Sequence, residues 1–381
     1  MWRVSTLARG VTGVTLLGAA VLVPAFAQDW KIGFIAPTSG PAATVGTRQL
    51  ATVRWWEHEV NAAKGIKGRP VQVVHCNDEG NPAKAVACAR DLLAQGVVLL
   101  INGSVSGAIR ATMPLVKNGP VMLTPAPGIV PDPSTYVFQT SPADIGLTTA
   151  VAEYAKASRV AQLGIVAATD TSGELGAASA AAVFPRYGVR YALARIDLRA
   201  TDATTQLTRV AGPETSLIYS TYTGAGAATV VKSYANLGLT QPLIVSYANI
   251  SDPFVAMIKD DLPARLLGVA LKGVVPELLT DPAERQRSTS FIKSYEQSRG
   301  GERVDMINMI ALGMVDVAES VLRNVADPSN ADDVKRYLES TAIKSFQTIR
   351  FSRESHVGMG PGDLVVVELK GNRWVKADPL K

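Results

Sequence analysis

The alternation of short apolar runs with longer amphipathic segments is the feature that most constrains the fold of this chain. Strand-length runs such as WKIGFIAP, VQVVHC, VVLLING and PVMLTPA alternate with helix-length segments between residues 30 and 130. The same order restarts near residue 145 and continues through RVAQLGIVAA, SLIYSTY and PLIVSYA. Continuous Val/Ile/Leu strands separated by helices are typical of parallel sheets that are covered on both faces. We therefore predict an α/β protein with two doubly wound parallel sheets.

The first 27 residues are typical of an exported protein. Two arginines precede an apolar stretch at residues 11–23, and Ala-Phe-Ala follows at residues 25–27. This pattern predicts a cleaved secretory signal over residues 1–27 and a mature chain that begins near Gln28, outside the cytoplasmic membrane. No later stretch reaches about 18 uninterrupted apolar residues, so we expect no integral membrane segment in the mature chain.

The length and charge of the remaining chain limit its organisation and its partners. It is longer than one core usually supports, because domains run to about 100–200 residues. We therefore expect two domains. The formal net charge of the whole chain is only +5, and basic and acidic residues are interspersed. This pattern gives no reason to expect a nucleic-acid partner.

The chain has two cysteines, Cys76 and Cys88. In an exported protein, a single pair of cysteines is more often a disulfide than a metal site. Cys76 should end a strand, and Cys88 should lie in the helix that begins at Asn81-Pro82. We predict a Cys76–Cys88 disulfide, which could contribute on the order of 3 kcal/mol to stability. Two buried free thiols are the alternative.

The sequence shows no motif for catalysis, a metal or a cofactor. The three histidines, His58, His75 and His356, are far apart and fit no metal-ligand spacing. The segment GSVSG lacks the spacing of a nucleophile elbow. In GAGAAT, Thr229 stands where the dinucleotide-binding fingerprint has its third glycine. We therefore expect a protein that is not an enzyme and has no cofactor.

The end of one apolar run is a candidate binding site. The run from Val97 to Ile101 stops at Asn-Gly-Ser-Val-Ser-Gly, residues 102–107, just where a helix should begin. Backbone N–H groups are exposed at a helix N-terminus, and their dipoles favour an anion. The loop is therefore a candidate site for part of a small anionic ligand. A polar loop that only caps its own helix is the alternative.

Several longer stretches resemble one family of receptors. They are KIGFIAPTSGPAATVGTRQL, NAAKGIKGRPVQVV, CNDEGNPAKAVACARDLL, INGSVSGA and LTPAPG. These stretches are similar to the branched-chain amino-acid-binding (Leu/Ile/Val) type of periplasmic solute receptor of ABC transporters, a type I periplasmic binding protein. The resemblance covers nearly the whole chain after residue 27, and the second half matches mainly in layout.

This resemblance implies two lobes joined by three crossover segments, with a solute captured in the cleft as the lobes close. The lobes should comprise residues 28–140 plus 273–345 (N-terminal) and 141–272 plus 346–381 (C-terminal). The crossings should fall near Thr140-Ser141, Leu271-Lys272-Gly273 and Phe346-Gln347. The implied partners are a small-molecule solute and the permease subunits of an ABC transporter. We expect a monomer in the periplasm.

The resemblance also implies the binding residues. In this family, the loops after the third and fourth strands hold the ligand carboxylate through backbone N–H groups and hydroxyls. These loops correspond here to Gly103, Ser104, Val105 and Ser106, and to Ala126, Pro127 and Gly128. The other expected contacts are Val45, Ser172, Tyr222, Tyr247 and Asn249. For the two tyrosines, ordinary packing within a lobe is the alternative.

Three departures from the family pattern bear on the ligand. Val45 stands where such receptors commonly have an aromatic residue, and Ser172-Gly173 stands near their tyrosine-glycine turn. The strand PLIVSYANIS carries Ser-Tyr-Ala-Asn, residues 246–249, where they have a glutamate for the ligand ammonium. A buried ammonium without an acidic partner would cost roughly several kcal/mol. We therefore hypothesise a small aliphatic or aromatic carboxylate that need not carry an amine, with Arg48 or Asn249 as polar contacts.

These observations favour a binding module that delivers its solute to a membrane permease. A freestanding ligand-sensing subunit of a signalling system is the alternative. An α/β enzyme would need a nucleophile-base pair or a metal cluster, and neither is visible in the sequence.

Overall fold

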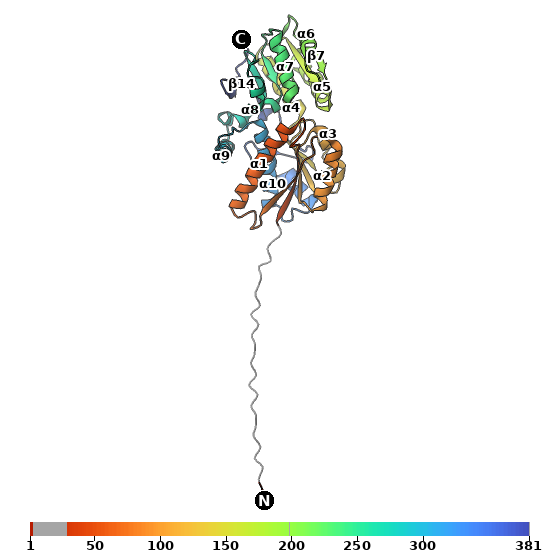
Figure 1. The fold of residues 1–381 in the computed structure, drawn as a ribbon, viewed down its shortest axis with the longest axis vertical. Coiled ribbons are helices and arrows are strands. Elements are labelled where there is room, and N and C mark those ends of the chain that lie inside the picture. The colour runs from red at the N-terminus through yellow and green to blue at the C-terminus, as the bar shows by residue number, and fades with distance from the viewer. Residues whose placement is uncertain (3–28, 198, 381) are drawn as a thin grey trace.

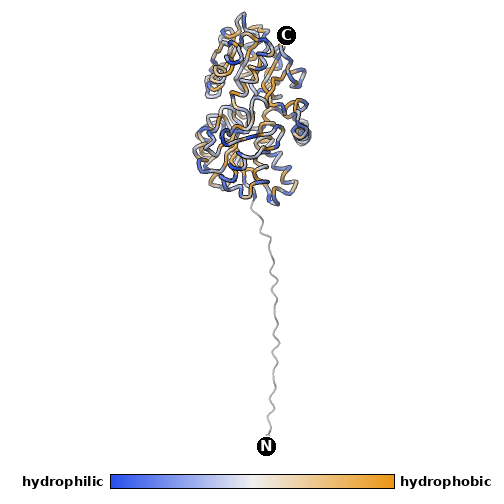
Figure 2. Tube along the Cα trace, turned by 180° about the vertical axis from the view of Figure 1, so that it is seen from behind, coloured by the Kyte–Doolittle hydropathy of each residue, from blue (hydrophilic) through white to orange (hydrophobic). Residues whose placement is uncertain are grey.

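The computed structural model describes residues 1–2, 29–197 and 199–380, so the predicted secretory signal, apart from residues 1–2, lies outside the described residues. Two sheets, each covered by helices, are arranged one after the other along the long axis (Figure 1). Hydrophobic residues run through the interior of both parts, and hydrophilic residues are frequent at the outer turns (Figure 2). The predicted α/β class with two doubly wound sheets is confirmed.

The first sheet is entirely parallel, with the strand order β13-β5-β4-β3-β1-β2. Its strands are β1 (Trp30–Ile35), β2 (Val71–Cys76), β3 (Leu99–Asn102), β4 (Val121–Thr124), β5 (Val137–Pro142) and β13 (Val357–Met359). Successive residues of β1 face opposite sides. Phe34 packs in the same cluster as Trp56 of α1 (Ala43–Ala62), and Ile35 packs with Leu92 of α2 (Pro82–Ala94) and Ile109 of α3 (Ser106–Thr112).

The second sheet has the order β15-β14-β10-β9-β8-β6-β7. Its parallel strands are β6 (Gln162–Ala168), β7 (Arg190–Ile196), β8 (Thr215–Ser220), β9 (Leu243–Val245) and β10 (Leu266–Leu271), and β14 (Leu364–Lys370) and β15 (Arg373–Lys376) add an antiparallel hairpin. The connecting helices are α4 (Asp144–Ala157), α5 (Thr171–Val183), α6 (Thr204–Val210), α7 (Gly224–Asn236) and α8 (Asp252–Met257).

After β10 the chain returns to the first sheet. It forms α9 (Pro282–Ser298), α10 (Met306–Asn324) and α11 (Ala331–Ser340), followed by the short pair β11 (Ala342–Ile343) and β12 (Ile349–Arg350). Nearly every residue of α10 is buried, and this helix packs along α1 and β5. Asp305 caps α10 by accepting hydrogen bonds from the N–H groups of Ile307 and Asn308. A helix that is apolar on most sides needs such a covered position.

The chain passes between the two sheets three times. The first two crossings, after β5 and after β10, lie close to the expected positions. The third crossing does not lie near Phe346-Gln347, because β13 still pairs with β5 of the first sheet. A Cβ on Gly313 of α10 would lie 3.4 Å from Phe346, so Phe346 packs beside α10 and keeps this segment on the first sheet. The structure therefore moves the third crossing to residues 360–363.

These crossings define the names used below. We call residues 29–142 and 275–359 the first lobe, and residues 143–274 and 360–380 the second lobe. None of the helices in the described part of the chain combines the length and the apolar character needed to cross a membrane.

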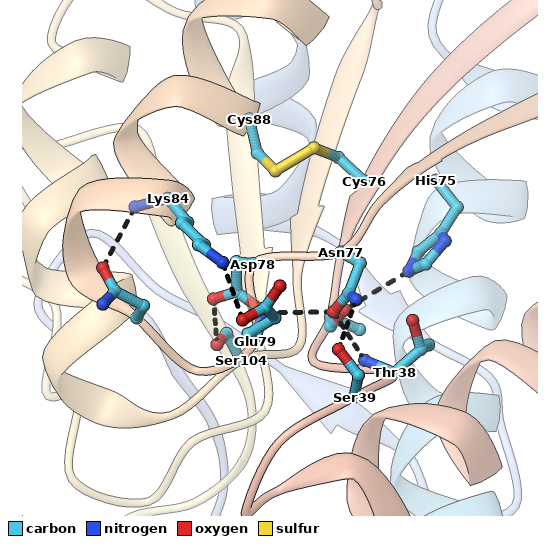
Figure 3. Close-up of a disulfide and its surroundings, with 12 residues drawn as sticks. Thr38, Ser39, His75, Cys76, Asn77, Asp78, Glu79, Lys84, Cys88 and Ser104 are labelled. Atoms are coloured by element: carbon cyan, nitrogen blue, oxygen red, sulfur yellow. Dashed lines mark hydrogen bonds and ion pairs between the residues drawn. A yellow bond between two sulfur atoms is a disulfide. The ribbon is translucent and has the colours of Figure 1, made fainter.

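The predicted disulfide is confirmed. Cys76 is the last residue of β2, and it is bonded to Cys88 in α2, with the two Cα atoms 5.6 Å apart (Figure 3). The side chain of Asn81 caps α2 by accepting hydrogen bonds from the N–H groups of Ala83 and Lys84. The disulfide therefore ties the end of the edge strand β2 to the helix that follows it.

Candidate functional site

A cavity of about 60 Å³ lies between the two lobes. This volume is several times the roughly 10–15 Å³ needed for one water molecule. The first lobe lines the cavity with Ser106, Pro127 and Gly128, and the second lobe with Asp144, Leu147, Thr148, Ser172, Gly176, Tyr219, Thr221, Thr223, Ser246 and Tyr247. Most of these residues lie at or just after the carboxyl ends of parallel strands, which is the usual ligand site of open α/β sheets. A wider groove of about 890 Å³ along α9 is open to solvent and shares no residue with this cavity.

Polar groups without partners converge on the cavity. Within the described part of the chain, the Asp144 carboxylate and the hydroxyls of Tyr219 and Tyr247 accept or donate no hydrogen bond. The Thr221 hydroxyl is buried and also lacks a partner. A buried polar group without a hydrogen bond costs about 1–3 kcal/mol. This cost applies to Thr221, whereas the Asp144 carboxylate and the tyrosine hydroxyls open into the cavity, where a polar ligand can reach them.

Asp144 dominates the electrostatics of the cavity. It is the first residue of α4, and its N–H donates to the carbonyl of Pro127 over 3.1 Å. Burial raises the pKa of its carboxyl to about 6, although the charge of Arg110 acts in the opposite direction. Burial, together with the charge of Asp144, also raises the pKa of the Tyr219 and Tyr247 hydroxyls. The carboxylate and the two phenols therefore share one environment.

The loop after β3 is mostly engaged within its own lobe. The N–H of Gly103 donates to the carbonyl of Ile35 over 2.9 Å. The N–H of Ser104 donates to the side chain of Asn102, and its hydroxyl donates to the buried carboxylate of Asp78 (Figure 3). Neither residue lines the cavity, nor does Val105, which is 39% exposed. Of the four residues predicted here, only Ser106 reaches the cavity.

The loop after β4 brings the lobes into close approach. A Cβ on Gly128 would lie 2.7 Å from Leu175 of the second lobe and 2.9 Å from the Ser106 hydroxyl. A larger residue at this position would therefore have to displace the side chains of Leu175 and Ser106. Arg110 of α3 donates to the carbonyl of Gly128 over 2.8 Å and steadies the loop. Pro127 also lines the cavity, whereas Ala126 does not.

Of the four second-lobe residues predicted as contacts, Ser172 and Tyr247 line the cavity, and Tyr222 and Asn249 do not. Asn249 accepts a hydrogen bond from the N–H of Gly224 and donates to the carbonyl of Tyr222, over 2.9 and 2.8 Å. The Tyr222 hydroxyl donates to the carbonyl of Asp197. These two residues therefore hold the second lobe together, because β8 and β9 end side by side and their loops bond to each other.

Val45 and Arg48 also lie away from the cavity. Val45 packs against the core of the first lobe. Arg48 is buried, and its guanidinium pairs with Glu302 and Asp305 over 2.5 Å each and donates to Asn308. It is therefore not the expected polar contact for a solute.

The sequence interpretation missed Asp144 and Tyr219. Asp144 follows the first crossing directly, and a segment at a crossing lies between both lobes. An acidic residue within a few positions of a predicted crossing was therefore the available signal. The alternation of SLIYS along β8 places Tyr219 on the opposite face from Ile218, but it does not say which face turns towards the cavity.

Comparisons with known proteins agree with this architecture. A family model described as periplasmic binding protein matches residues 29–373. The Leu/Ile/Val-binding protein BraC3 of Rhizobium johnstonii is 30% identical over 144 residues, which is 37% of this chain and 39% of that protein. The match therefore spans about two fifths of the relative's length.

Two solved structures have the same fold. An ABC transporter substrate-binding protein from Sphaerobacter thermophilus superimposes with a TM-score of 0.78 at 18% identity, over 92% of this chain and 97% of that one. A solute-binding protein of an ABC transporter from Rhodopseudomonas palustris, solved in complex with benzoate, gives a TM-score of 0.75 at 18% identity, over 91% of this chain and 95% of that one.

Proposed function

Because this chain belongs to the periplasmic binding protein family, we propose that it is the solute receptor of an ABC importer and that its solute is a small amino acid. The solute lies in the cavity between the lobes. The predicted secretory signal at residues 1–27 supports a periplasmic location. The similar proteins that are described as parts of ABC transporters support a permease as the partner.

The Asp144 carboxylate is the observation that carries this proposal. The strand PLIVSYANIS lacks the glutamate expected for a ligand ammonium, but α4 supplies an acid to the same cavity. The carboxylate has no hydrogen-bond or ion-pair partner among the described residues, and burial disfavours its charge. A ligand ammonium would provide the missing partner and offset the cost of burying the carboxylate.

The other lining residues suit the rest of an amino acid. The hydroxyls of Ser106, Ser172 and Thr221 can donate to a carboxylate, and each lines the cavity. The rings of Tyr219 and Tyr247 and the side chain of Leu147 offer apolar surface for a small side chain. The cavity therefore has an acidic group for an ammonium, neutral donors for a carboxylate and an apolar wall for a side chain. An amino acid with an apolar side chain needs these three kinds of contact.

A thermal-shift panel of the twenty amino acids, each matched with the acid that lacks its amine, tests this proposal. We expect only the amino acids to raise the melting temperature. L-leucine and 4-methylpentanoate form one matched pair, and calorimetry should show the acid binding at least about tenfold more weakly, which is about 1.4 kcal/mol. Benzoate is included because a protein of the same fold was solved with it.

The pH dependence separates the two ligand classes. A ligand ammonium needs an ionised Asp144, so amino-acid affinity should fall as the pH drops through the pKa of about 6. An acid without an amine needs Asp144 protonated, so its affinity should rise over the same interval. Stabilisation by the acids alone, with tighter binding at low pH, would contradict the proposal.

A further inference from the structure

A bidentate ion pair joins the two lobes. Arg303 lies between α9 and α10 in the first lobe. Its guanidinium donates to both carboxylate oxygens of Asp252, the first residue of α8 in the second lobe, over 2.7 and 2.6 Å. It also donates to the carbonyl of Asn372 in the β14–β15 turn. In Figure 1, α8 and α9 lie close together at one edge of the boundary between the lobes.

The backbone at Arg303 is fixed to the first lobe. Arg48 donates to the carbonyl of Arg303 over 2.6 Å, and the Arg48 side chain is only 8% exposed. On the other side, the N–H of Val304 donates to Glu296 of α9 over 3.1 Å. The guanidinium of Arg303 therefore reaches the second lobe from a rigid support.

On the second lobe, the ion pair acts on the segment that forms one wall of the cavity. Asp252 follows a short 3-10 helix, Tyr247–Asn249, and Tyr247 lines the cavity. The carbonyl of Ile250, within the same segment, accepts a hydrogen bond from the N–H of Met306 of the first lobe over 3.2 Å. Separation of the lobes along this edge would break both contacts and withdraw Tyr247.

We propose that Arg303 and Asp252 form a latch that favours the closed arrangement of the lobes and positions the Tyr247 wall against the solute. The inference rests on the proposed solute-binding function. The two side chains are 42% and 46% exposed, so water can replace each partner when the pair opens. When only the closed form binds tightly, the apparent Kd varies inversely with the closed fraction. The latch therefore sets the affinity without touching the solute.

A double-mutant cycle with Arg303→Ala and Asp252→Asn tests the latch. We expect each single variant to raise the Kd for L-leucine about three- to fivefold, in line with an exposed but bidentate pair. The double variant should bind no more weakly than either single variant. Without solute, small-angle scattering should give a larger radius of gyration for all three variants than for the wild type.

Arg299→Ala is the matched control, because the ion pair of Arg299 among the described residues is with Glu302 of its own segment, over 3.2 Å. The latch is overturned if the Kd values and radii of gyration of Arg303→Ala and Asp252→Asn equal those of this control. It is also overturned if the increases in Kd of the two single variants multiply in the double variant. If L-leucine does not bind the wild type, the scattering result still decides the latch, whereas the amino-acid proposal fails by itself.

Discussion

The two lobes face one cavity with opposite chemistry. In the first lobe, the N–H of Gly103 and the hydroxyl of Ser104 bond within the lobe, and the cavity is lined only by Ser106, Pro127 and Gly128 among its described residues. In the second lobe, the Asp144 carboxylate and the Tyr219 and Tyr247 hydroxyls have no hydrogen-bond partner among the residues that the structure describes. The first lobe therefore acts as a preformed support, and the second lobe supplies the groups that distinguish one solute from another.

The bracing of the first lobe continues away from the cavity. The Cys76–Cys88 disulfide holds the strand that leads to Asp78, whose carboxylate accepts from both Ser104 and the N–H of Gly80 (Figure 3). On the other face of the sheet, Arg48 connects α1 to the start of α10. If this contrast is correct, substitutions in the first lobe should change stability, and substitutions in the second lobe should change affinity.

Arg48→Met should have the largest effect on stability. It leaves the buried carboxylate of Asp305 without its cation, and removal of one partner of a buried pair costs about 3–5 kcal/mol. We expect that loss in the free energy of unfolding, measured with urea. Affinity for the solute should be retained wherever the variant is folded, because Arg48 does not line the cavity.

Arg54→Met is the control, because Arg54 is 46% exposed and pairs with Glu57 on the same helix. Its loss should cost less than about 1 kcal/mol. A variant at Arg48 that keeps its stability but loses solute affinity would break the comparison between the lobes.

Replacement of both Cys76 and Cys88 by serine should have the next largest effect. The disulfide joins residues 12 positions apart, and a loop of this size contributes about 3 kcal/mol by restricting the unfolded chain. We expect this loss in urea unfolding and little change in the Kd measured on the folded protein. A weaker Kd at unchanged stability would show instead that the disulfide shapes the cavity.

Asp144→Asn should show the reverse behaviour. Amino-acid affinity should fall at least about tenfold, equivalent to about 1.4 kcal/mol, because the ligand ammonium loses its partner. Stability should not decrease, since burial raises the pKa of this carboxyl and so disfavours its charged form. Calorimetric titration and urea unfolding measure the two effects.

Asp170→Asn provides a contrast on the same lobe. Asp170 caps α5 by accepting from the N–H of Gly173 over 2.9 Å, and it does not line the cavity. The asparagine keeps the capping oxygen, so both affinity and stability should stay near the wild type. Equal losses of affinity at both positions would indicate a general field effect rather than a specific contact.

His356 is buried and its ring nitrogens contact Val137 and Glu339, so His356→Gln should lower the free energy of unfolding and also change its pH dependence. Burial lowers the pKa of this histidine, which stacks on Phe138 in the first lobe. The folded state therefore favours the neutral imidazole. The unfolded chain takes up the proton at the ordinary pKa of 6.5, and the folded protein takes it up only at lower pH. The wild type therefore loses stability as the pH falls from 6.5 through the folded-state pKa. The variant lacks this loss.

The urea midpoint of His356→Gln minus that of the wild type should increase as the pH falls below 6.5. Asp144→Asn should change in the opposite direction. In the wild type, the buried charged carboxylate of Asp144 lowers stability above a pKa of about 6, and protonation at lower pH removes this loss. Asp144→Asn has no such carboxylate, so its stability falls relative to the wild type as the pH decreases. A constant difference across the pH range would contradict either assignment.

Features encoded within a few residues could be predicted from the sequence. The disulfide, the strand ending at Cys76 and the helix capped by Asn81 each depend on neighbouring positions. The two doubly wound sheets follow from the repeated strand and helix pattern. In each case the signal and the structure it produces lie in the same short segment.

Features that depend on distant partners could not be predicted. Arg48 is anchored by Glu302 and Asp305, which lie more than 250 positions away. The segment SPADIG places Asp144 beside a crossing, but it does not show that the carboxylate will face a cavity formed by both lobes. The third crossing was misplaced for a similar reason, because the short strand β13 is defined by its pairing with β5 rather than by its own composition.

The position of β13 has a consequence for biosynthesis. The ribosome makes β1 to β5 early, but the strand that covers the outer edge of β5 is made only when residues 357–359 are reached. The hairpin that completes the second sheet follows still later. An uncovered edge strand can pair with another chain. The growing polypeptide therefore carries an unfinished edge in both halves until residues 357–376 have been made, and a chain truncated before residue 357 can complete neither.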